Sequence, residues 1–352
     1  MGMRPSLQSL RVTPEILSLV AEIDEFKGLW QDVGRLPPAR LSALRRVATI
    51  ESVGSSTRIE GSRLSDAEVE RLLANLEIRS FASRDEQEVA GYAQVMEMVF
   101  AHCEHIDLTE NHIRQLHRDL LAHSAKDERH RGSYKTLPNH VSAFDAEGRE
   151  IGVIFETASP FDTPRRMAEI VAWTREVLEG RAVHPLVAIA VFTVVFLEIH
   201  PFQDGNGRLS RILTTLLLLR CGYNYVSYAS LENVVEQSKE SYYLALRRTQ
   251  KTIGDPEPDW EPWLAYFLGA LGQQKRNLEA KLARERLLAD ALPELSRRIL
   301  DVVTAHERAT IGELVALTGA NRNTIKKHLA ALVAARRLER HGVGRGSWYQ
   351  RA

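Results

Sequence analysis

Two apolar segments separated by a short polar stretch stand out in the hydrophobic pattern of the chain. Residues 186–199 are almost entirely apolar, and residues 209–219 are rich in leucine before Cys221 and Gly222, where a helix would end. Helices that are apolar on all sides lie buried in a protein core. The pattern therefore predicts two buried helices joined by a polar connection, with the second helix beginning near residues 205–207.

Helical spacing of apolar residues predicts six further helices, over residues 41–52, 65–76, 84–101, 109–122, 164–179 and 260–290. Two of these segments start with N-cap residues, Ser65 and Thr109, and Glu68 completes a capping box with Ser65. The chain is therefore predicted to be mainly α.

One stretch before the C-terminal region has the pattern of a strand pair. Residues 145–148 form a turn-like sequence, and Ile151, Val153 and Phe155 alternate after it. Residues 142–155 are therefore predicted to form a β-hairpin, preceded by the segments 131–135 and 137–141.

The C-terminal 60 or so residues have a different character. Helices are predicted over 294–306, 310–318 and 321–335, with Gly319 at the turn between the second and third. Two strand-like segments, 337–340 and 347–349, flank the glycine-rich residues 342–346. This order resembles a small α+β winged helix-turn-helix domain.

Charge distinguishes this region from the rest of the chain. From Lys281 onward there are 14 basic and seven acidic residues, a net charge of +7, whereas the whole chain is balanced at 46 against 46. One interpretation is DNA binding through phosphates first and bases second. The candidate residues are Asn321, Arg322, Asn323, Thr324, Lys326, Lys327 and Arg345. The other interpretation is contact with a target protein or a second copy of the chain, as in a homodimer.

Length and composition set further bounds. A chain of 352 residues can hold two or three domains with a large core. Cys103 and Cys221 match no metal-binding spacing and are expected to be free thiols. No signal-like segment is present at the N-terminus, and the apolar run before His200 is shorter than the roughly 20 residues that span a bilayer. We therefore expect a cytoplasmic protein with no membrane contact.

The polar connection carries the candidate chemistry. Histidine ordinarily has a pKa near neutrality, so His200 is suited to accept a proton from an attacking hydroxyl. Asp204 offers a hard oxygen ligand for Mg²⁺ shared with phosphate oxygens. Gly205, Asn206 and Gly207 fall where backbone N–H groups of a starting helix can hold an anion. The residue types predict a phosphoryl-type transfer site.

Two arginines extend this site along the second helix. Arg208 and Arg211 are three residues apart, so both lie on one helical face and can reach a polyphosphate.

The segment His200-Pro-Phe-Gln-Asp-Gly-Asn-Gly-Arg-Leu-Ser-Arg211 resembles the signature of the Fic family, H-P-F-x-[DE]-G-N-G-R-x-x-R, at every fixed position. The resemblance implies transfer of AMP from ATP, with Mg²⁺, to a hydroxyl side chain of a target protein. It makes His200 the general base, Asp204 the magnesium ligand and residues 205–207 the anion cradle. Arg208 becomes a phosphate contact, and Arg211 the contact for the terminal phosphate.

A shorter motif lies far upstream. Residues 56–61, Ser-Thr-Arg-Ile-Glu-Gly, are similar to the inhibitory pattern [ST]-x-x-x-E-[GN] of the family. This implies that Glu60 pairs with Arg211 and occupies the space of the γ-phosphate, with Ser56 helping to hold the helix. The alternative is a helix that ends at Gly61 with an exposed glutamate.

Two further family features are implied. The hairpin over 142–155 takes the position of the family's flap, which pairs with the backbone of the target, and a plain surface hairpin is the alternative. Tyr242 and Tyr243 match a position that lines the nucleotide base, and because adjacent helical residues face different ways, we expect one of them, assigned as Tyr242, to contact adenine.

The sequence thus predicts four parts. These are an N-terminal helical region with the inhibitory helix (1–105), a Fic catalytic core (106–270), a linker helix (271–290) and a winged helix (291–352). The predicted function is an autoinhibited protein adenylyltransferase. Two alternatives remain: removal of AMP with Glu60 orienting a water, and a DNA-binding regulator whose Fic domain senses nucleotide.

Overall fold

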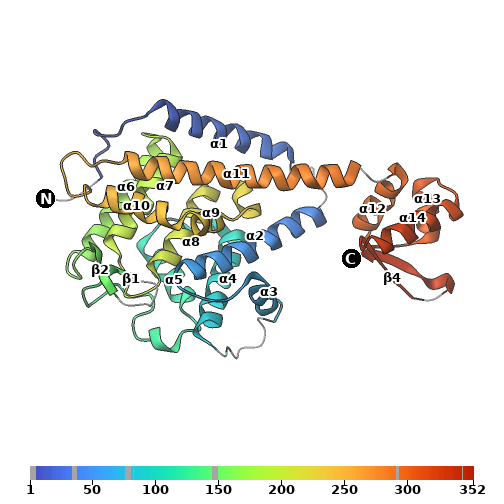
Figure 1. Ribbon diagram of the computed structural model, residues 1–352, viewed down its shortest axis with the longest axis horizontal. Coiled ribbons are helices and arrows are strands. Elements are labelled where there is room, and N and C mark those ends of the chain that lie inside the picture. Colours follow the sequence, from blue (N-terminus) through green and yellow to red (C-terminus); the bar gives the residue numbers. More distant parts are fainter. Residues whose placement is uncertain are drawn as a thin grey trace. The chain divides into compact units, whose positions relative to one another are not determined.

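The computed structural model describes residues 5–33, 38–75, 81, 83–144, 150–290, 293–342 and 344–352. Helices predominate among them, and the strands form one two-stranded and one three-stranded sheet (Figure 1). The chain divides into a larger unit, Met1–Val33 with Leu44–Arg276, and a smaller unit, Gly34–Ala43 with Asn277–Ala352. The predicted mainly α fold class is confirmed.

The larger unit contains most of the helices. They are α1 (Pro14–Val33), α2 (Pro38–Ile59) from Leu44 onward, α3 (Asp66–Leu73), α4 (Arg84–His102), α5 (Glu110–Leu120), α6 (Thr163–Gly180), α7 (Pro185–Ile199), α8 (Asn206–Arg220), α9 (Leu231–Gln237), α10 (Lys239–Gln250) and the start of α11 (Glu261–Asp290). Short 3₁₀ turns are η1 (Cys103–His105), η2 (Ala125–Asp127) and η3 (Asn224–Tyr228).

Helices α7 and α8 form the centre of this unit. Residues 186–197 of α7 and residues 208–219 of α8 are all buried. Helices α6 and α10 pack on α7, and α4 and α5 pack on α8. The two predicted buried helices are confirmed, and the turn between them lies where the core meets its covering helices.

Helix α2 is longer than its pattern predicts. It continues past residue 52 to Ile59 through the small residues Ser55, Ser56 and Thr57, all fully buried. Serine and threonine are poor helix formers, so their periodic signal is weak, and burial against the core sustains the helix instead. Farther along, the predicted capping box of Ser65 and Glu68 is present at the start of α3.

A hairpin precedes α6. Strand β1 (His140–Phe144) pairs antiparallel with β2 (Glu150–Glu156), with His140 opposite Glu156 and two register irregularities. The predicted strand pair is confirmed, while its predicted turn at 145–148 lies outside the described residues.

The smaller unit follows the predicted order of elements. It contains α12 (Glu294–Ala305), β3 (Arg308–Thr310), α13 (Ile311–Thr318), α14 (Arg322–Ala334), β4 (Leu338–His341), the 3₁₀ turn η4 (Gly344–Gly346) and β5 (Trp348–Arg351). The sheet order is β3-β5-β4, with both pairs antiparallel. Gly319 ends α13 with a φ of 68°, a left-handed conformation that suits glycine.

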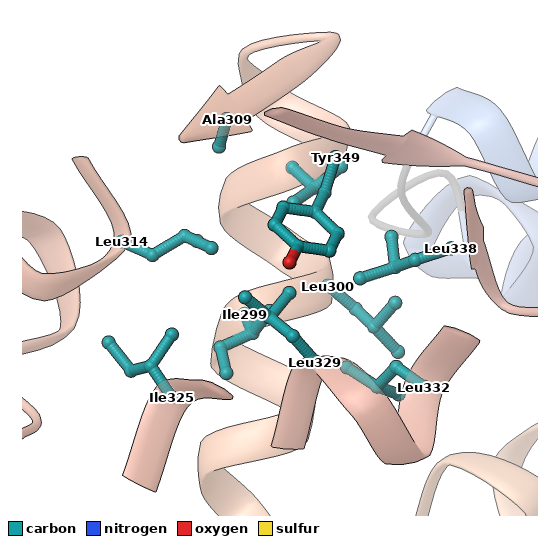
Figure 2. Close-up of a cluster of buried hydrophobic side chains, with 10 residues drawn as sticks. Ile299, Leu300, Ala309, Leu314, Ile325, Leu329, Leu332, Leu338 and Tyr349 are labelled. Atoms are coloured by element: carbon teal, nitrogen blue, oxygen red, sulfur yellow. The ribbon is translucent and has the colours of Figure 1, made fainter. Parts of the chain in front are cut away.

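This unit has a core of its own, drawn in Figure 2. The buried residues are Ile299, Leu300, Val303, Ala309, Leu314, Ile325, Leu329, Leu332, Leu338 and Tyr349. Strand β3, which contributes Ala309, was not predicted, because three residues are too few to show an alternating pattern. The four-part division drawn from the sequence stays a prediction.

No helix in the described part of the chain combines the length and apolar character needed to span a membrane.

Candidate active site

The polar turn between α7 and α8 begins at His200, directly after the last residue of α7. Its backbone has φ 52° and ψ 59°, a left-handed conformation that is uncommon for a residue with a side chain. Two residues later, Phe202 is fully buried and stacks on the ring of His117, with ring centroids 3.8 Å apart. The turn is therefore tightly built, and it places the imidazole of His200 at the end of a buried helix.

The side chain of Asn206 closes this turn. Its Oδ1 accepts from the N–H of Phe202 at 2.9 Å, and its Nδ2 donates to the carbonyl of Phe202 at 2.7 Å. Gly205 caps α8 with a φ of 79°, which glycine adopts without steric cost. Because the Asn206 side chain is used within the turn, an anion here would be met by backbone N–H groups of the first turn of α8.

The imidazole of His200 is held in one protonation state. Its Nδ1 lies 3.2 Å from the carbonyl of Leu197, which can only accept, so Nδ1 carries the proton and Nε2 has the free lone pair. Burial lowers the pKa of His200 to about 4, helped by the charge of Lys135 and opposed by the Leu197 hydrogen bond. The ring is neutral at pH 7, the state in which Nε2 can accept a proton.

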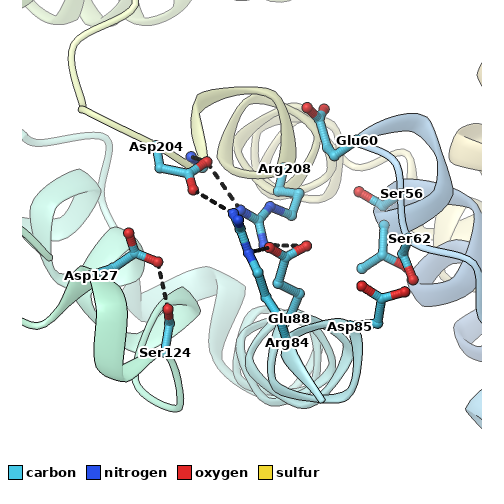
Figure 3. A network of polar contacts seen from close by, with 12 residues as sticks. Ser56, Glu60, Ser62, Arg84, Asp85, Glu88, Ser124, Asp127, Asp204 and Arg208 are labelled. Atoms are coloured by element: carbon cyan, nitrogen blue, oxygen red, sulfur yellow. Dashed lines mark hydrogen bonds and ion pairs between the residues drawn. The ribbon is translucent and has the colours of Figure 1, made fainter. Parts of the chain in front are cut away.

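Asp204 lies between two arginines from different helices. Arg84 of α4 donates to Oδ2 at 3.0 Å, and Arg208 of α8 lies 3.3 Å from Oδ1 (Figure 3). Burial pushes the pKa of Asp204 upward, but the charges of Arg208 and Arg84 and the N–H of Gly205 outweigh it and lower the pKa. The carboxylate is therefore ionised in this setting.

Glu88 of α4 joins the same two arginines. Its Oε1 accepts from Nε of Arg84 at 2.8 Å, and its Oε2 lies 3.2 Å from Nη1 of Arg208. Arg208 is only 2% exposed, and in the described part of the chain its Nε and Nη1 have no hydrogen-bond partner of good geometry. Buried N–H groups in this state favour a bound anion as their acceptor.

The carboxylate of Asp204 fits a magnesium ion. It is a hard, ionised oxygen donor of the kind Mg²⁺ prefers. Within the described ranges, no three His, Cys, Asp or Glu side chains gather into a metal-binding group. Asp204 would hold Mg²⁺ together with phosphate oxygens and water, the usual setting of nucleotide-bound magnesium.

Glu60 meets Arg211 across 151 positions of sequence. Nη2 of Arg211 lies 2.8 Å from Oε1 of Glu60 and 2.9 Å from the Ser56 carbonyl, and Nε donates to Oγ of Ser56 at 2.8 Å. Burial pushes the pKa of Glu60 upward, but the charge and hydrogen bond of Arg211 lower it. The glutamate that follows α2 is thus an ionised partner of the second signature arginine.

The same carboxylate lies over the start of α8. A Cβ placed on Gly207 would overlap the carboxylate of Glu60, so the absence of a side chain at 207 allows this approach. Both residues line a cavity of about 140 Å³ together with His200, Asp204 and Arg211. Ligand sites are usually roughly 300–1,000 Å³, so the cavity is too small for a whole nucleotide while Glu60 points into it.

Tyr242 and Tyr243 both line this cavity. Tyr242 is 5% exposed and packs against the rings of Trp263 and Tyr266, whereas Tyr243 is half-buried. Tyr243 is thus the more accessible of the two rings, although Tyr242 was assigned to the base from the sequence.

Sequence reasoning missed three side chains that hold the turn: Arg84, Glu88 and His117. His117 accepts the N–H of Gly132 at Nδ1, at 2.8 Å, and its Nε2 lies 2.9 Å from the carbonyl of Asp204. Arg84 and Glu88 are four residues apart, which in sequence is the pattern of an ordinary surface ion pair. Only the fold brings them to Asp204 and Arg208.

Comparison with known proteins agrees with this geometry. The model of the Fic/DOC family matches residues 107–218, and a model described as a bacterial protein of unknown function (DUF977) matches residues 288–347. The proteins named protein adenylyltransferase Fic from Drosophila sechellia and Drosophila grimshawi are 28% and 27% identical over 61% and 62% of this chain. The chain spans 40% and 41% of the length of these two curated relatives.

Solved structures share the fold. A Fic family protein from Desulfovibrio desulfuricans has a TM-score of 0.62 at 24% identity, and 98% of each chain is covered. A Fic domain containing signaling protein from Bacteroides thetaiotaomicron has a TM-score of 0.58 at 24% identity, covering 75% of this chain and 95% of that one. The described helices, the turn at His200 and the family match lead to one conclusion: residues 107–218 match the Fic/DOC family, and the chain is distantly related to protein adenylyltransferase Fic.

Proposed function

We propose that this protein transfers AMP from ATP to a Ser, Thr or Tyr hydroxyl of a target protein, and also to its own side chains. One observation supports this most: a neutral His200, the start of α8 and Arg211 line the same cavity. A base, an anion-binding helix start and a cation are the parts that nucleotidyl transfer needs together. The name of the relatives, protein adenylyltransferase, favours the same chemistry.

In the proposed reaction, Nε2 of His200 accepts the hydroxyl proton while the hydroxyl oxygen attacks the α-phosphorus of ATP. The new oxygen–phosphorus bond forms as the bond from the α-phosphorus to the bridging oxygen breaks, and diphosphate leaves with its electron pair. The first turn of α8, Arg208 and Arg211 hold the phosphate oxygens in line. Mg²⁺ at Asp204, when bound, neutralises charge on those oxygens.

We further propose that Glu60 restrains this activity. Nη2 of Arg211 is already hydrogen-bonded to Glu60, so a γ-phosphate that needs this guanidinium must compete with the carboxylate. The pair brings an anion to the place where the terminal phosphate would lie, and two anions there repel. ATP would then be held with its α-phosphorus out of line with the hydroxyl.

The adenine and the target have candidate places as well. Tyr242 and Tyr243 of α10 line one side of the cavity. The ring of Tyr243 is the more accessible of the two, so it is the better candidate for contact with adenine. The β1–β2 hairpin is the candidate flap that pairs with the target backbone as an added strand.

The test uses two labelled forms of ATP. The purified Glu60→Gly variant is incubated with Mg²⁺ and ATP labelled at either the α- or the γ-phosphate, and protein-bound label is measured after denaturation. AMP transfer predicts label from the α-position only. Label from the γ-position would instead indicate a kinase-like phosphate transfer and would contradict the proposal.

Two alternatives each rest on a specific observation. Glu60 lines the same cavity as His200, so it could orient a water that removes AMP from a modified protein. Helix α14 exposes Arg322, Lys326 and Lys327, which favours DNA binding by the smaller unit. Release of AMP from a pre-labelled protein, lost on Glu60→Gly, would support the first; salt-dependent duplex binding would support the second.

A further inference from the structure

A buried lysine lies directly behind the His200 turn. Lys135 is only 3% exposed, and its ammonium group lies 2.7 Å from Oδ1 of Asn139, 2.8 Å from Oγ1 of Thr157 and 3.0 Å from the carbonyl of Ile199. An ammonium group has three N–H donors, and here each has one acceptor. The charge is therefore fully hydrogen-bonded within the protein.

Together, Lys135 and Asn139 supply hydrogen bonds to four consecutive carbonyls of the turn. The side chain of Lys135 donates to Ile199, and its backbone N–H donates to Pro201 at 2.8 Å. Nδ2 of Asn139 donates to Phe202 at 2.8 Å and lies 3.5 Å from the carbonyl of His200. These contacts hold the backbone of His200 in its left-handed conformation, which neighbouring structure must enforce.

The same group joins the two ends of the hairpin. Asn139 comes directly before β1, and Thr157 comes directly after β2. Oγ1 of Thr157 lies 2.6 Å from the carbonyl of Asn139 and 2.7 Å from its Oδ1. Lys135 thus contacts both ends of the hairpin and the end of α7 at once.

The charge of Lys135 is suited to this place. Ile199 is the last residue of α7, where helix carbonyls lack partners and the helix dipole favours a cation. Burial lowers the pKa of Lys135 to about 8, opposed by the charge of Glu198, so the amine is still mostly protonated at pH 7. Burying an uncharged side chain here would cost less free energy than burying an ammonium group, which indicates that Lys135 has a role beyond packing.

We propose that Lys135 is a positioning residue that holds the His200 turn and both ends of the β1–β2 hairpin as one unit. The inference rests on the proposed function, because its consequence is that a hydroxyl presented by the hairpin arrives at a fixed place relative to Nε2 of His200. Lys135 itself touches neither ATP nor the hydroxyl in this account.

The experiment compares Lys135→Met with the matched control Lys251→Met, an exposed lysine at the end of α10, both in the Glu60→Gly background. Three quantities are measured: self-labelling kinetics with α-labelled ATP, ATP affinity by calorimetry, and amide hydrogen exchange of residues 150–157 against the buried helix segments 186–197 and 208–219. Thr157→Val serves as a second variant that removes one of the same contacts without removing a charge.

For Lys135→Met we expect kcat of labelling to fall by about tenfold to a hundredfold, since misplacement by about 1 Å has such effects. The KM for ATP and the calorimetric affinity should stay within about twofold. Exchange of residues 150–157 should speed up by about tenfold while that of the helix segments 186–197 and 208–219 is unchanged. Thr157→Val should change the same quantities in the same direction, and Lys251→Met none of them.

Two results would overturn the inference. In the first, both Lys135→Met and Thr157→Val take label, and exchange the amides of the hairpin, at the same rates as the parent. The other is ATP affinity lost together with faster exchange of 186–197 and 208–219, which would make Lys135 a general stabiliser of the core. If the Glu60→Gly parent itself takes no label, the proposed function fails, and the exchange measurement still decides whether Lys135 anchors the hairpin.

Discussion

At the scale of single residues, the proposed reaction assigns proton transfer and phosphate binding to different residues. His200 presents a neutral Nε2, fixed by the hydrogen bond from Nδ1 to Leu197. The groups suited to phosphate are the start of α8, Arg208 and Arg211. Substitutions at these two kinds of residue should therefore affect different measurements.

His200→Ala should lower the rate of AMP transfer by about 100-fold or more and leave the affinity for ATP within about twofold of the parent. The imidazole serves the hydroxyl, whereas the phosphates are held by other groups. Parallel calorimetry and label transfer, both in the Glu60→Gly background, measure the two effects. Loss of ATP affinity equal to the loss of activity would show that His200 supports the fold of the turn instead.

Asp204→Ala should weaken ATP binding in the presence of Mg²⁺ and leave binding without divalent cation nearly unchanged. The reason is that the ionised carboxylate of Asp204 is suited to bind the same Mg²⁺ ion as the phosphates of ATP. Calorimetric titration of ATP with and without Mg²⁺ gives the comparison. Equal weakening under both conditions would contradict a metal-ligand role.

Some of these residue roles were accessible from sequence, and others were not. His200, Asp204 and Arg211 fall within one twelve-residue segment whose residue types already predict phosphate chemistry. The contact between Glu60 and Arg211 joins residues 151 positions apart, so neither hydrophobic periodicity nor residue spacing could predict it. Only the family resemblance predicted this contact. Lys135 was placed in the segment 131–135 before the hairpin but was given no role, because lysine is normally exposed and its burial depends on acceptors from three separate segments.

At the scale of elements, the end of α2 is held by more than Glu60. Arg58 makes a bidentate ion pair with Glu236 of α9, at 2.6 and 3.0 Å, and contacts Asp66 at 2.9 Å. Lys239 of α10 donates to the carbonyl of Ile59 at 2.8 Å. The residue before Glu60 is thus tied to α10, the helix that also carries Tyr242 and Tyr243.

Arg58→Ala should therefore raise self-labelling several-fold, yet less than Glu60→Gly does. Loss of a partly buried bidentate pair costs about 1–3 kcal/mol and loosens the end of α2 without removing the glutamate. Arg46→Ala is the matched control, because Arg46 lies on the same helix as Arg58, and its pair with Glu70 of α3 is highly exposed and worth little. Labelling by Arg58→Ala equal to that of Arg46→Ala would contradict a role of this pair in restraint.

The helices and strands were predicted best where a single strong sequence pattern, such as an apolar run or a capping residue, determines the element. The apolar runs of α7 and α8 and the capping residues of α3 and α5 were found from sequence. The end of α2 was missed because its small polar residues depend on tertiary burial, and β3 because its partner β5 lies 40 residues away. Local pattern could indicate neither.

At the scale of the whole molecule, the chain joins a larger helical unit, which contains the match to the Fic/DOC family, to a basic C-terminal unit with a core of its own. Residues from 281 onward carry a net charge of +7 in a chain that is neutral overall. Asn321 caps α14, and Arg322, Asn323, Thr324, Lys326 and Lys327 are exposed on it. The side chain of Arg345 lies outside the described residues, so its predicted part at the wing is left to experiment.

If the smaller unit binds DNA, the full chain should bind duplex DNA more weakly as salt rises, because basic side chains release counterions from phosphates. Combined neutralisation of Lys326 and Lys327 to Gln should weaken binding to all sequences and reduce the salt slope by about 2. Fluorescence anisotropy at several salt concentrations gives both quantities, with His200→Ala as a control that should bind normally. No binding at low salt would favour protein contacts for this unit.

The central claim is that the chain is an AMP-transferring enzyme held back by the pair of Glu60 and Arg211. Label transfer from α-labelled ATP with Mg²⁺, compared between wild type, Glu60→Gly and Glu60→Gly with His200→Ala, tests it most directly. We predict little label on wild type, at least about tenfold more on Glu60→Gly, and none on the double variant. Equal or lower label on a folded Glu60→Gly variant would contradict the claim.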